Sequence, residues 1–400
     1  MTPAFLLANS DANFTLAMLL VFGSAKLFAE IFERLSLPGL VGEILAGVLL
    51  GPAVLNWIRP SELLSSLAHL GVMFLLFRVG LEVKSSSLMR VGGQAALVAV
   101  GGVVLPFFAG WGIYLAWGKP QLESVFIGAA MVATSVGITA QVLAARGLLH
   151  LMASKIILAA AVIDDVLGLL VLAVVSGMAK GPLNFFDLGL TAALASAFVL
   201  VAALWGSKAM NRVMPRVVNL RVQEAGFTFA VLLLFGLALL ASYAGVAAIV
   251  GAFLAGMALS ESTAPRVLDL TNGASALLLP FFLVGIGLNV NLTPFAQPAT
   301  LILASVIIFA AIASKWLGCG LGAFRLGFAE ANRIGAGMIP RGEVGMVVAQ
   351  IGLTLGAVSR ETYAIAVAMA VMTTLIAPLL LKWTFRKATP GQATNDLRLD

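Results

Sequence analysis

The sequence predicts an all-α integral membrane protein. Apolar residues make up 61% of the 400 residues and charged residues only 10%, whereas a soluble domain carries about 25% charged residues. The mean hydropathy is +1.06. The apolar residues fall into runs of about 20, the length that an α-helix needs to cross a bilayer. A chain of this composition leaves no room for a sizeable soluble domain.

Apolar segments follow one another along the whole chain, separated by short polar loops, and each predicts one transmembrane helix. The 41 glycines agree with this interpretation, because small residues let membrane helices approach closely. The thirteen predicted segments are residues 13–32, 38–55, 63–81, 91–117, 123–145, 151–178, 186–206, 225–243, 245–260, 274–290, 297–323, 330–356 and 361–383.

The basic residues predict the orientation of these helices. If the N-terminus lies outside, sixteen Lys and Arg residues fall in inner loops and the C-terminal tail, and only Arg59, Lys119, Lys180 and Arg360 fall in outer loops. Lys and Arg accumulate on the cytoplasmic side of membrane proteins. We therefore expect a periplasmic or outer N-terminus and a cytoplasmic C-terminus. Topology also explains the pI near 9.7 better than nucleic-acid binding does, because no basic run has interleaved aromatics.

Three short sequence matches within the chain predict an internal repeat. Residues 41–47 resemble 250–256, residues 80–83 resemble 287–290, and residues 135–137 resemble 343–345, at offsets of 209, 207 and 208 residues. The offsets share one register, which maps the second segment onto the ninth, a shift of seven segments. Because an odd shift turns the second copy upside down in the membrane, we expect the inverted repeat of secondary transporters.

Two adjacent acids, Asp164 and Asp165, lie in the middle of the apolar segment 151–178. A carboxylate at that depth costs roughly 2.5–3.5 kcal/mol on insertion scales, and helix packing requires neither acid. Neighbouring helical residues point about 100° apart, so one acid can pair with a cation while the other faces a water-filled cavity. The pair predicts ion or proton handling. An intramembrane aspartyl protease is disfavoured, because its two carboxylates must face each other, and we expect no enzyme activity.

Lys315 is the candidate partner for one of these acids. It is the only lysine deep within the C-terminal half, in segment 297–323. An ammonium there is as costly as the acids, and an ion pair offsets much of that cost. The alternative is that Lys315, about eight residues from the inner end of its segment, extends to the inner surface.

Two segments carry interruptions at positions that correspond in the repeat. Residues 134–139 (TSVGIT) place hydroxyls around a glycine, and residues 339–345 (IPRGEVG) place a proline and charges at mid-segment. Proline breaks a helix, and unwound backbone at this depth must line protein or water. We expect two crossing discontinuous helices whose free carbonyls and hydroxyls offer cation ligands, with Arg341 and Glu343 neutralising one another and the half-helix dipoles. The candidate lining residues are Thr134, Ser135, Gly137, Thr139, Pro340, Arg341, Glu343 and Gly345.

Other charged residues in the apolar segments have structural explanations. Lys26 and Glu30, spaced i, i+4, are expected to pair with each other or to extend to the surface. For Glu43 and Arg78, interhelical pairing and cavity lining both stay open, and His69 is expected in the interior. The single cysteine, Cys319, excludes an internal disulfide, and two histidines exclude a His-rich metal site. No cofactor is expected.

Four motifs resemble those of bacterial sodium/proton antiporters of the NapA type, which share the NhaA-like fold. The resemblance extends over almost the whole chain. It implies a thirteen-helix homodimer in the bacterial inner membrane, in which Asp165 binds the ion and Asp164 pairs with Lys315. Asp164 and Thr134 are further candidate sodium ligands. The motifs are VATSVGITA at 132–140, AVIDDVLG at 161–168, Lys315, and PRGEVG at 340–345.

The resemblance also implies a division of labour between domains. A dimerisation domain comprises residues 1–90 and 225–292, and a mobile core comprises 91–180 and 293–387, with a linker helix at 181–224 and a cytoplasmic tail at 388–400. Members with two acids and this lysine are similar to electrogenic exchangers. We therefore expect Na⁺ or Li⁺ to exchange for protons. The alternatives are a potassium/proton or electroneutral exchanger, or a sodium-coupled organic anion transporter on the same fold.

Overall fold

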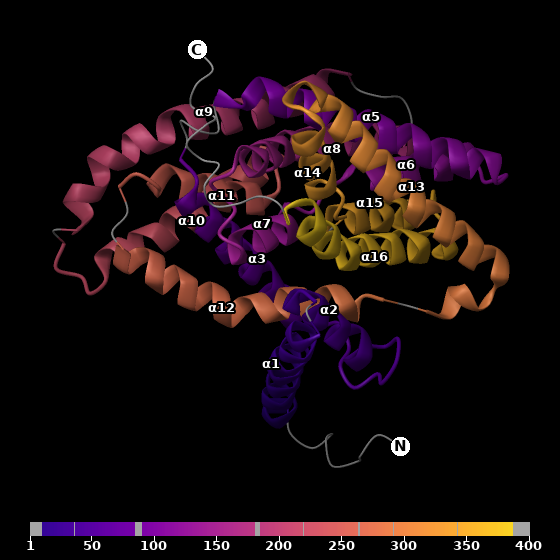
Figure 1. Ribbon diagram of the computed structural model, residues 1–400, viewed down its shortest axis with the longest axis horizontal. Helices are drawn as coiled ribbons and strands as arrows, with labels where there is room; N and C mark the ends of the chain where they lie inside the picture. The colour runs from indigo at the N-terminus through magenta and orange to yellow at the C-terminus, as the bar shows by residue number, and fades with distance from the viewer. Residues whose placement is uncertain are drawn as a thin grey trace. The chain divides into compact units, whose positions relative to one another are not determined.

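The computed structural model describes residues 10–35, 37–84, 90–180, 185–218, 220–262, 265–290, 292–341 and 343–386. All regular secondary structure in these residues is helical (Figure 1), which confirms the predicted all-α class. Two short 3₁₀ turns, η2 (Thr293–Ala296) and η3 (Phe324–Leu326), precede and follow α13. The α-helices are α1 (Ser10–Arg34), α2 (Gly39–Leu50), α3 (Glu62–Glu82), α5 (Gly92–Ala116), α6 (Gln121–Val132), α7 (Val136–Ala145), α8 (Met152–Lys180), α9 (Phe185–Val218), α10 (Ala225–Tyr243), α11 (Ala248–Leu259), α12 (Pro265–Leu288), α13 (Pro298–Gly322), α14 (Phe328–Gly337), α15 (Glu343–Thr354) and α16 (Arg360–Thr384).

Every predicted apolar segment overlaps one helix or a pair of short helices, but α9 continues to Val218 and α12 begins at Pro265, beyond the predicted bounds 186–206 and 274–290. The extra turns carry polar and charged residues, which hydropathy alone assigned to loops. In the described part of the chain, ten stretches are long and apolar enough to cross a membrane. Three apolar helices are shorter, at Gly39–Leu50, Ala248–Leu259 and Gly345–Thr354. The protein is therefore a multi-pass helical membrane protein, and the number of thirteen crossings stays a prediction.

Several helices begin at residues whose chemistry suits a helix start. Pro298 occupies the first turn of α13, where a missing N–H costs nothing because the first backbone N–H groups of a helix have no partner within the helix. The hydroxyl of Ser359 caps α16 by accepting a hydrogen bond from the backbone N–H of Thr362 at 3.2 Å. The same serine donates its backbone N–H to Glu123 of α6 at 3.0 Å, so this cap also ties α16 to α6.

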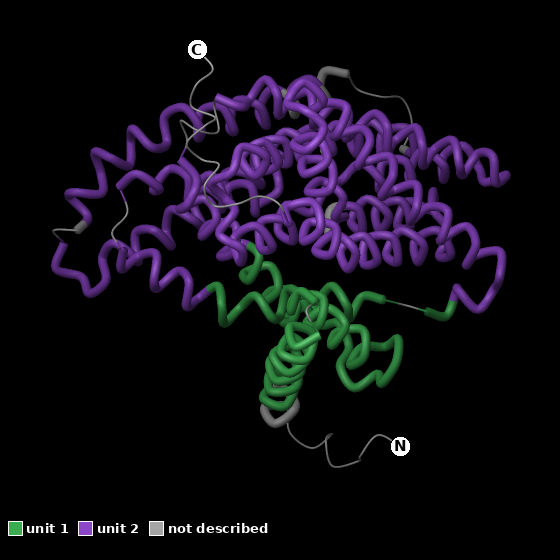
Figure 2. The backbone as a smooth tube through the Cα atoms, viewed as in Figure 1, with its two compact units in different colours: residues 1–72, 275–293 green, residues 73–274, 294–400 purple. Residues whose placement is uncertain are grey.

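The chain divides into two compact units, shown in different colours in Figure 2. The smaller unit comprises residues 1–72 and 275–293 and includes α1, α2 and the second half of α12. Its helices approach closely where glycines meet backbone: Gly47 of α2 packs against the carbonyl of Val284, and Gly287 packs against that of Ile44. The apolar core of this unit contains Val21, Ala25, Leu50, Ile58, Leu64, Phe281, Val284 and Leu288.

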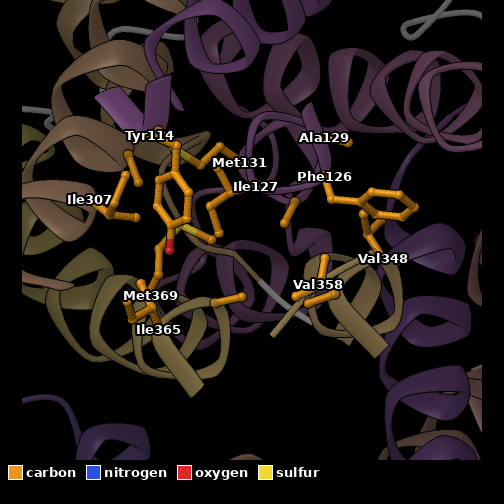
Figure 3. Close-up of a cluster of buried hydrophobic side chains, with 14 of the residues drawn as sticks. Tyr114, Phe126, Ile127, Ala129, Met131, Ile307, Val348, Val358, Ile365 and Met369 are labelled. Atoms are coloured by element: carbon orange, nitrogen blue, oxygen red, sulfur yellow. The ribbon is translucent and has the colours of Figure 1, made fainter. Parts of the chain in front are cut away.

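The larger unit comprises residues 73–274 and 294–400 and contains the long apolar helices α5, α8 and α13. Figure 3 shows part of its buried cluster, in which side chains of α5, α6, α13 and α16 meet around the ring of Tyr114. Phe126, Ile307 and Ile365, from three different helices, are fully buried there. These contacts fix α6 in place, and α6 leads directly into the first of the two predicted breaks. The predicted division into dimerisation and core domains stays a prediction.

Some of the expected pairings of membrane charges were wrong. Lys26 does not pair with Glu30: its ammonium lies 2.8 Å from Glu43 of the neighbouring helix α2, and Glu30 pairs with Arg34 at 2.7 Å. Spacing along one helix could not reveal a closer acid on another helix. Arg78 pairs at 3.6 Å with Glu82 of its own helix α3 rather than between helices. His69, which was expected in the interior, is exposed.

Candidate ion-binding site at two broken helices

The two adjacent acids of α8 have different surroundings, as their divergence on a helix requires. Asp164 is 1% exposed, and its carboxylate accepts hydrogen bonds from Lys315 and from the hydroxyl of Thr134, the latter at 2.6 Å. Asp165 is 8% exposed. It lines a small pocket whose other walls are apolar: Leu76, Val136, Leu158, Val162, Val250 and Phe253. The two acids thus lie in different parts of the site: Asp164 contacts Lys315 and Thr134, and Asp165 is among the residues that line the pocket.

Lys315 of α13 is fully buried, so it does not extend to the inner surface. Its ammonium donates to the carboxylate of Asp164 at 3.0 and 3.1 Å, to the carbonyl of Gly102 at 2.8 Å and to that of Val132 at 2.7 Å. An ammonium has three N–H donors, and these three groups use all of them. The surroundings of Lys315 are therefore built for its protonated form.

Gly102 of α5 leaves the space in which the ammonium sits. A methyl group at this position would lie 3.2 Å from both Nζ and Cε of Lys315 and 2.6 Å from the sulfur of Cys319. Because the glycine has no side chain, the backbone of α5 can approach Lys315 closely and offer it a carbonyl. Gly102 is thus a positioning residue for the buried ion pair.

The first break separates α6, which ends at Val132, from α7, which begins at Val136. Between them the backbone is extended, with φ −57° and ψ 137° at Ala133. An extended segment leaves the last carbonyls of α6 without helical partners. Arg341 supplies partners, since its guanidinium donates to the carbonyls of Val132 and Ala133, both at 3.1 Å. We predicted that carbonyls at this break would offer ligands to a transported cation. In this structure the side chains of Arg341 and Lys315 occupy them instead.

Arg341 lies in the second break and is fully buried. Besides the two carbonyls of α6, its guanidinium donates to the carbonyl of Ala311 on α13 at 3.1 Å. Its positive charge lies at the C-terminal end of α6, where the helix dipole is negative. The side chain of Glu343 lies outside the described residues, so its predicted pairing with Arg341 stays a prediction.

The second break separates α14, which ends at Gly337, from α15, which begins at Glu343. Pro340 lies between them, and its ring disfavours helical backbone at the preceding residue. Hydroxyls of α16 satisfy the backbone of Arg341: its N–H donates to Thr373 at 3.1 Å, and its carbonyl accepts from Thr374 at 2.8 Å. The unwound segment is therefore bonded to protein on both sides.

The structure brings the two breaks together. The backbone N–H of Ser135 in the first break donates to the carbonyl of Pro340 in the second at 2.7 Å. The hydroxyl of Thr139 on α7 donates to the carbonyl of Gly337 at 2.6 Å. Gly137 lies in the first turn of α7, directly after the first break. Of the predicted lining residues, Thr134 alone contacts an acid of α8 through its side chain in the described hydrogen bonds.

Gly345 lies in the first turn of α15 and lets this helix approach α6. A methyl group there would lie 2.9 Å from the carbonyl oxygen of Ala130. Three other contributors to the site were not predicted: Gly102, Thr373 and Thr374. The adjacent threonines in an otherwise apolar segment were the available signal for the last two.

A multi-pass helical protein with buried, partnered charges where two unwound segments meet is a membrane transporter. Residues 17–387 match the sequence pattern of the transmembrane region of the sodium/hydrogen exchanger family. The chain belongs to this family of cation/proton antiporters. The prediction that it is not an enzyme is confirmed.

Relatives along the full length of the chain agree with this membership. The Na⁺/H⁺-K⁺ antiporter GerN of Bacillus cereus is 35% identical over 381 residues, covering 94% of this chain and 97% of GerN. The high-affinity Na⁺/H⁺ antiporter NhaS3 of Synechocystis is 33% identical over 430 residues, covering 96% and 92%. The sodium proton antiporter MjNhaP1 of Methanocaldococcus jannaschii has a similar structure, with a TM-score of 0.68 at 20% identity, covering 94% of this chain and 96% of MjNhaP1. This last likeness shows a shared fold.

Proposed function

We propose that this protein exchanges sodium ions for protons across a bacterial inner membrane, and that Asp165 is the carboxylate at which they compete. The observation that carries the proposal is the buried ion pair of Lys315 and Asp164, next along α8 to an acid that lines a pocket. The pair accounts for Lys315 and Asp164, and Asp165 is the second carboxylate at this site. GerN and NhaS3, whose names include sodium/proton antiport, add support.

Competition at Asp165 is sufficient for exchange. The carboxylate holds either a proton or a sodium ion, and either state lets the site turn to the other side of the membrane. A ligand shifts such an equilibrium only through its different affinity for the two states. The inward proton gradient then drives sodium out. Thr134 and Asp164 are candidate additional sodium ligands, because a hydroxyl and a carboxylate already lie 2.6 Å apart at the break.

We further propose that exchange is electrogenic. If sodium draws Asp164 away from Lys315, the ammonium loses its carboxylate while it stays buried. A buried lysine without a counter-charge tends to release its proton. Two protons then cross for each sodium ion. The cycle moves net charge, and the membrane potential contributes about 2.3 kcal/mol per charge per 100 mV.

Equivalent glycine contacts in the two halves support the inverted repeat. In the smaller unit, Gly47 contacts the Val284 carbonyl, and in the larger unit Gly256 contacts that of Phe77. The offsets of 209 and 207 residues map the first contact onto the second. The reciprocal contacts of Gly287 with Ile44 and of Gly80 with Phe253 correspond in the same way. On this basis we propose the thirteen-crossing, NapA-type architecture. The distribution of Lys and Arg supports the proposed outer N-terminus and cytoplasmic C-terminus, and the proposed homodimer rests on the resemblance to the NapA type.

Substitution of Asp165 by Asn tests the site. The change keeps the size of the side chain but removes the carboxylate at which sodium ions and protons are proposed to compete. We therefore expect no sodium-driven proton flux in proteoliposomes. Asp269→Asn changes an exposed acid of α12 and is the matched control, with normal flux expected. Robust sodium/proton exchange by the Asp165 variant would refute the assignment.

Potassium is the second candidate cation, because the name of GerN includes K⁺. The test is proton flux driven by each of Na⁺, Li⁺ and K⁺ in turn, in vesicles without organic solutes. A response to sodium or lithium alone supports the first proposal, and an equal response to potassium supports the second. Proton flux that requires an organic anion would instead favour sodium-coupled anion uptake, which family membership does not support.

A further inference from the structure

The exposed side chains of α9, the helix whose course Figure 1 shows, change from apolar to basic along its length. Its apolar part includes Val201 and Trp205, which are 51% and 57% exposed. Its basic part consists of Lys208, Arg212 and Arg216, all exposed. The steps from 201 to 205, 208, 212 and 216 are four, three, four and four residues, which keep side chains on one face of a helix.

The change from apolar to basic marks the surface of the bilayer. Tryptophan is enriched at membrane–water interfaces, and Trp205 precedes Lys208 by one helical turn, about 4.5 Å. The three basic side chains then extend over eight residues, or about 12 Å along the helix axis. They lie at the depth of lipid headgroups and just beyond.

The nearest acids are engaged elsewhere. Glu261 accepts a hydrogen bond at 3.0 Å from Ser207, which is on the buried side of α9. Glu224 pairs with Arg266 at 2.8 Å. None of the ion pairs in the described part of the chain includes one of the three basic residues. Among the described residues, these three charges are therefore available to bind an anionic partner.

We propose that Lys208, Arg212 and Arg216 form a binding surface for the headgroup of an anionic phospholipid. Arginine binds phosphate in a bidentate manner, and juxtamembrane basic clusters attract anionic lipids. The lipid's acyl chains would lie along the exposed apolar residues Val201, Leu204 and Trp205 of the same face. The alternative explanation is that these basic residues only set the orientation of the helix in the membrane. Orientation requires positive charge on the inner side, but it does not require three basic residues on the same helix face as the exposed Trp205.

The surface lies on the helix that connects the two proposed copies of the repeat. A lipid held there fixes the end of α9, whose other side packs against α11 at Gly206 and Ala258 and against α10 at Met214 and Gly226. The bound lipid is expected to stabilise the protein against thermal unfolding. The proposal is independent of which cation the antiporter carries.

The experiment is thermal unfolding of the detergent-purified full chain with added phosphatidylglycerol or phosphatidylcholine. Phosphatidylglycerol is expected to raise the unfolding temperature more than phosphatidylcholine does. The variant K208Q/R212Q/R216Q is expected to need about a hundredfold more phosphatidylglycerol for the same rise, at about 1 kcal/mol per basic residue and 1.4 kcal/mol per tenfold. The single variant R212Q is expected to need about fivefold more.

A matched control variant separates this surface from general electrostatic attraction. K84Q/R146Q/R325Q also removes three exposed positive charges, from other loops, and is expected to respond like the unmodified protein. An equal loss of response in both triple variants would overturn the proposal, as would an unchanged response in K208Q/R212Q/R216Q and R212Q. A rise of the same size with inorganic phosphate alone would assign the surface to free phosphate and overturn the lipid.

Discussion

Two lysine–carboxylate pairs, one in each compact unit, have similar bond lengths and different surroundings. Lys26 and Glu43 of the smaller unit lie 2.8 Å apart, and Lys315 and Asp164 of the larger unit lie 3.0 Å apart. The side chain of Lys26 is 48% exposed, whereas that of Lys315 is fully buried.

The difference shows that surroundings, rather than bond length, decide what an ion pair does. The half-exposed side chain of Lys26 can extend to the membrane surface if its partner is lost, so we expect its pair to contribute less. Lys315 is fully buried, and its ammonium contacts two carbonyls and one carboxylate. If either Lys315 or Asp164 loses the other, an unpaired charge stays buried. Because a buried unpaired charge is costly, the group tends to become neutral by gaining or releasing a proton. Of the two pairs, the buried one is the pair that we propose couples a proton to the ion.

The largest expected effect is on the buried pair. Lys315→Gln leaves Asp164 without its counter-charge, and breaking a buried pair costs about 3–5 kcal/mol. Thermal unfolding in detergent measures the loss. If Lys315→Gln were as stable as the unmodified protein, the charge of Lys315 would contribute nothing to the fold.

A double variant separates a structural pair from a proton carrier. Lys315→Gln with Asp164→Asn removes both charges, so part of the lost stability should return. Any remaining exchange should become electroneutral, because one proton fewer crosses per cation. Exchange rates in proteoliposomes with and without an imposed potential measure this. If the exchange rate of the double variant still depends on the membrane potential as in the unmodified protein, the second proton binds elsewhere.

The space around the ammonium is the next test. Gly102→Ala places a methyl group 3.2 Å from Nζ of Lys315, and overpacking of this kind costs about 1–3 kcal/mol. Gly112→Ala is the control on the same helix, since no atom lies within 4 Å of its added methyl group. Unfolding temperatures of the two variants should therefore differ. Equal temperatures would show that α5 moves aside without cost.

The smallest effect is expected at the half-exposed pair. Glu43→Gln should cost about 1 kcal/mol or less, because the half-exposed side chain of Lys26, which loses its partner, can extend to the membrane surface. Thermal unfolding in detergent measures this loss too. A penalty at Glu43 as large as that of Lys315→Gln would remove the contrast between the two pairs.

Part of the site could be predicted because charge is rare at membrane depth. Asp164, Asp165 and Lys315 are conspicuous in apolar segments, and Pro340 marks a break by its own covalent structure. Gly102 and Thr373 gave no comparable signal. Glycine and threonine are frequent in membrane helices for packing reasons, so their roles depend on which helix lies beside them.

The sequence by itself determined the helical membrane class, the family and the depth of the charged residues, because hydropathy and the cost of burying charge act locally along the chain. Residue spacing left open which acid meets Lys315, and the resemblance implied Asp164. The tertiary structure brings these two residues together although they lie 151 positions apart. It also gave Lys26 its partner on α2 and turned the carbonyls at the first break toward Arg341 rather than leaving them free. Such pairings depend on how the helices pack, and residue spacing within a single helix carries no record of its neighbours.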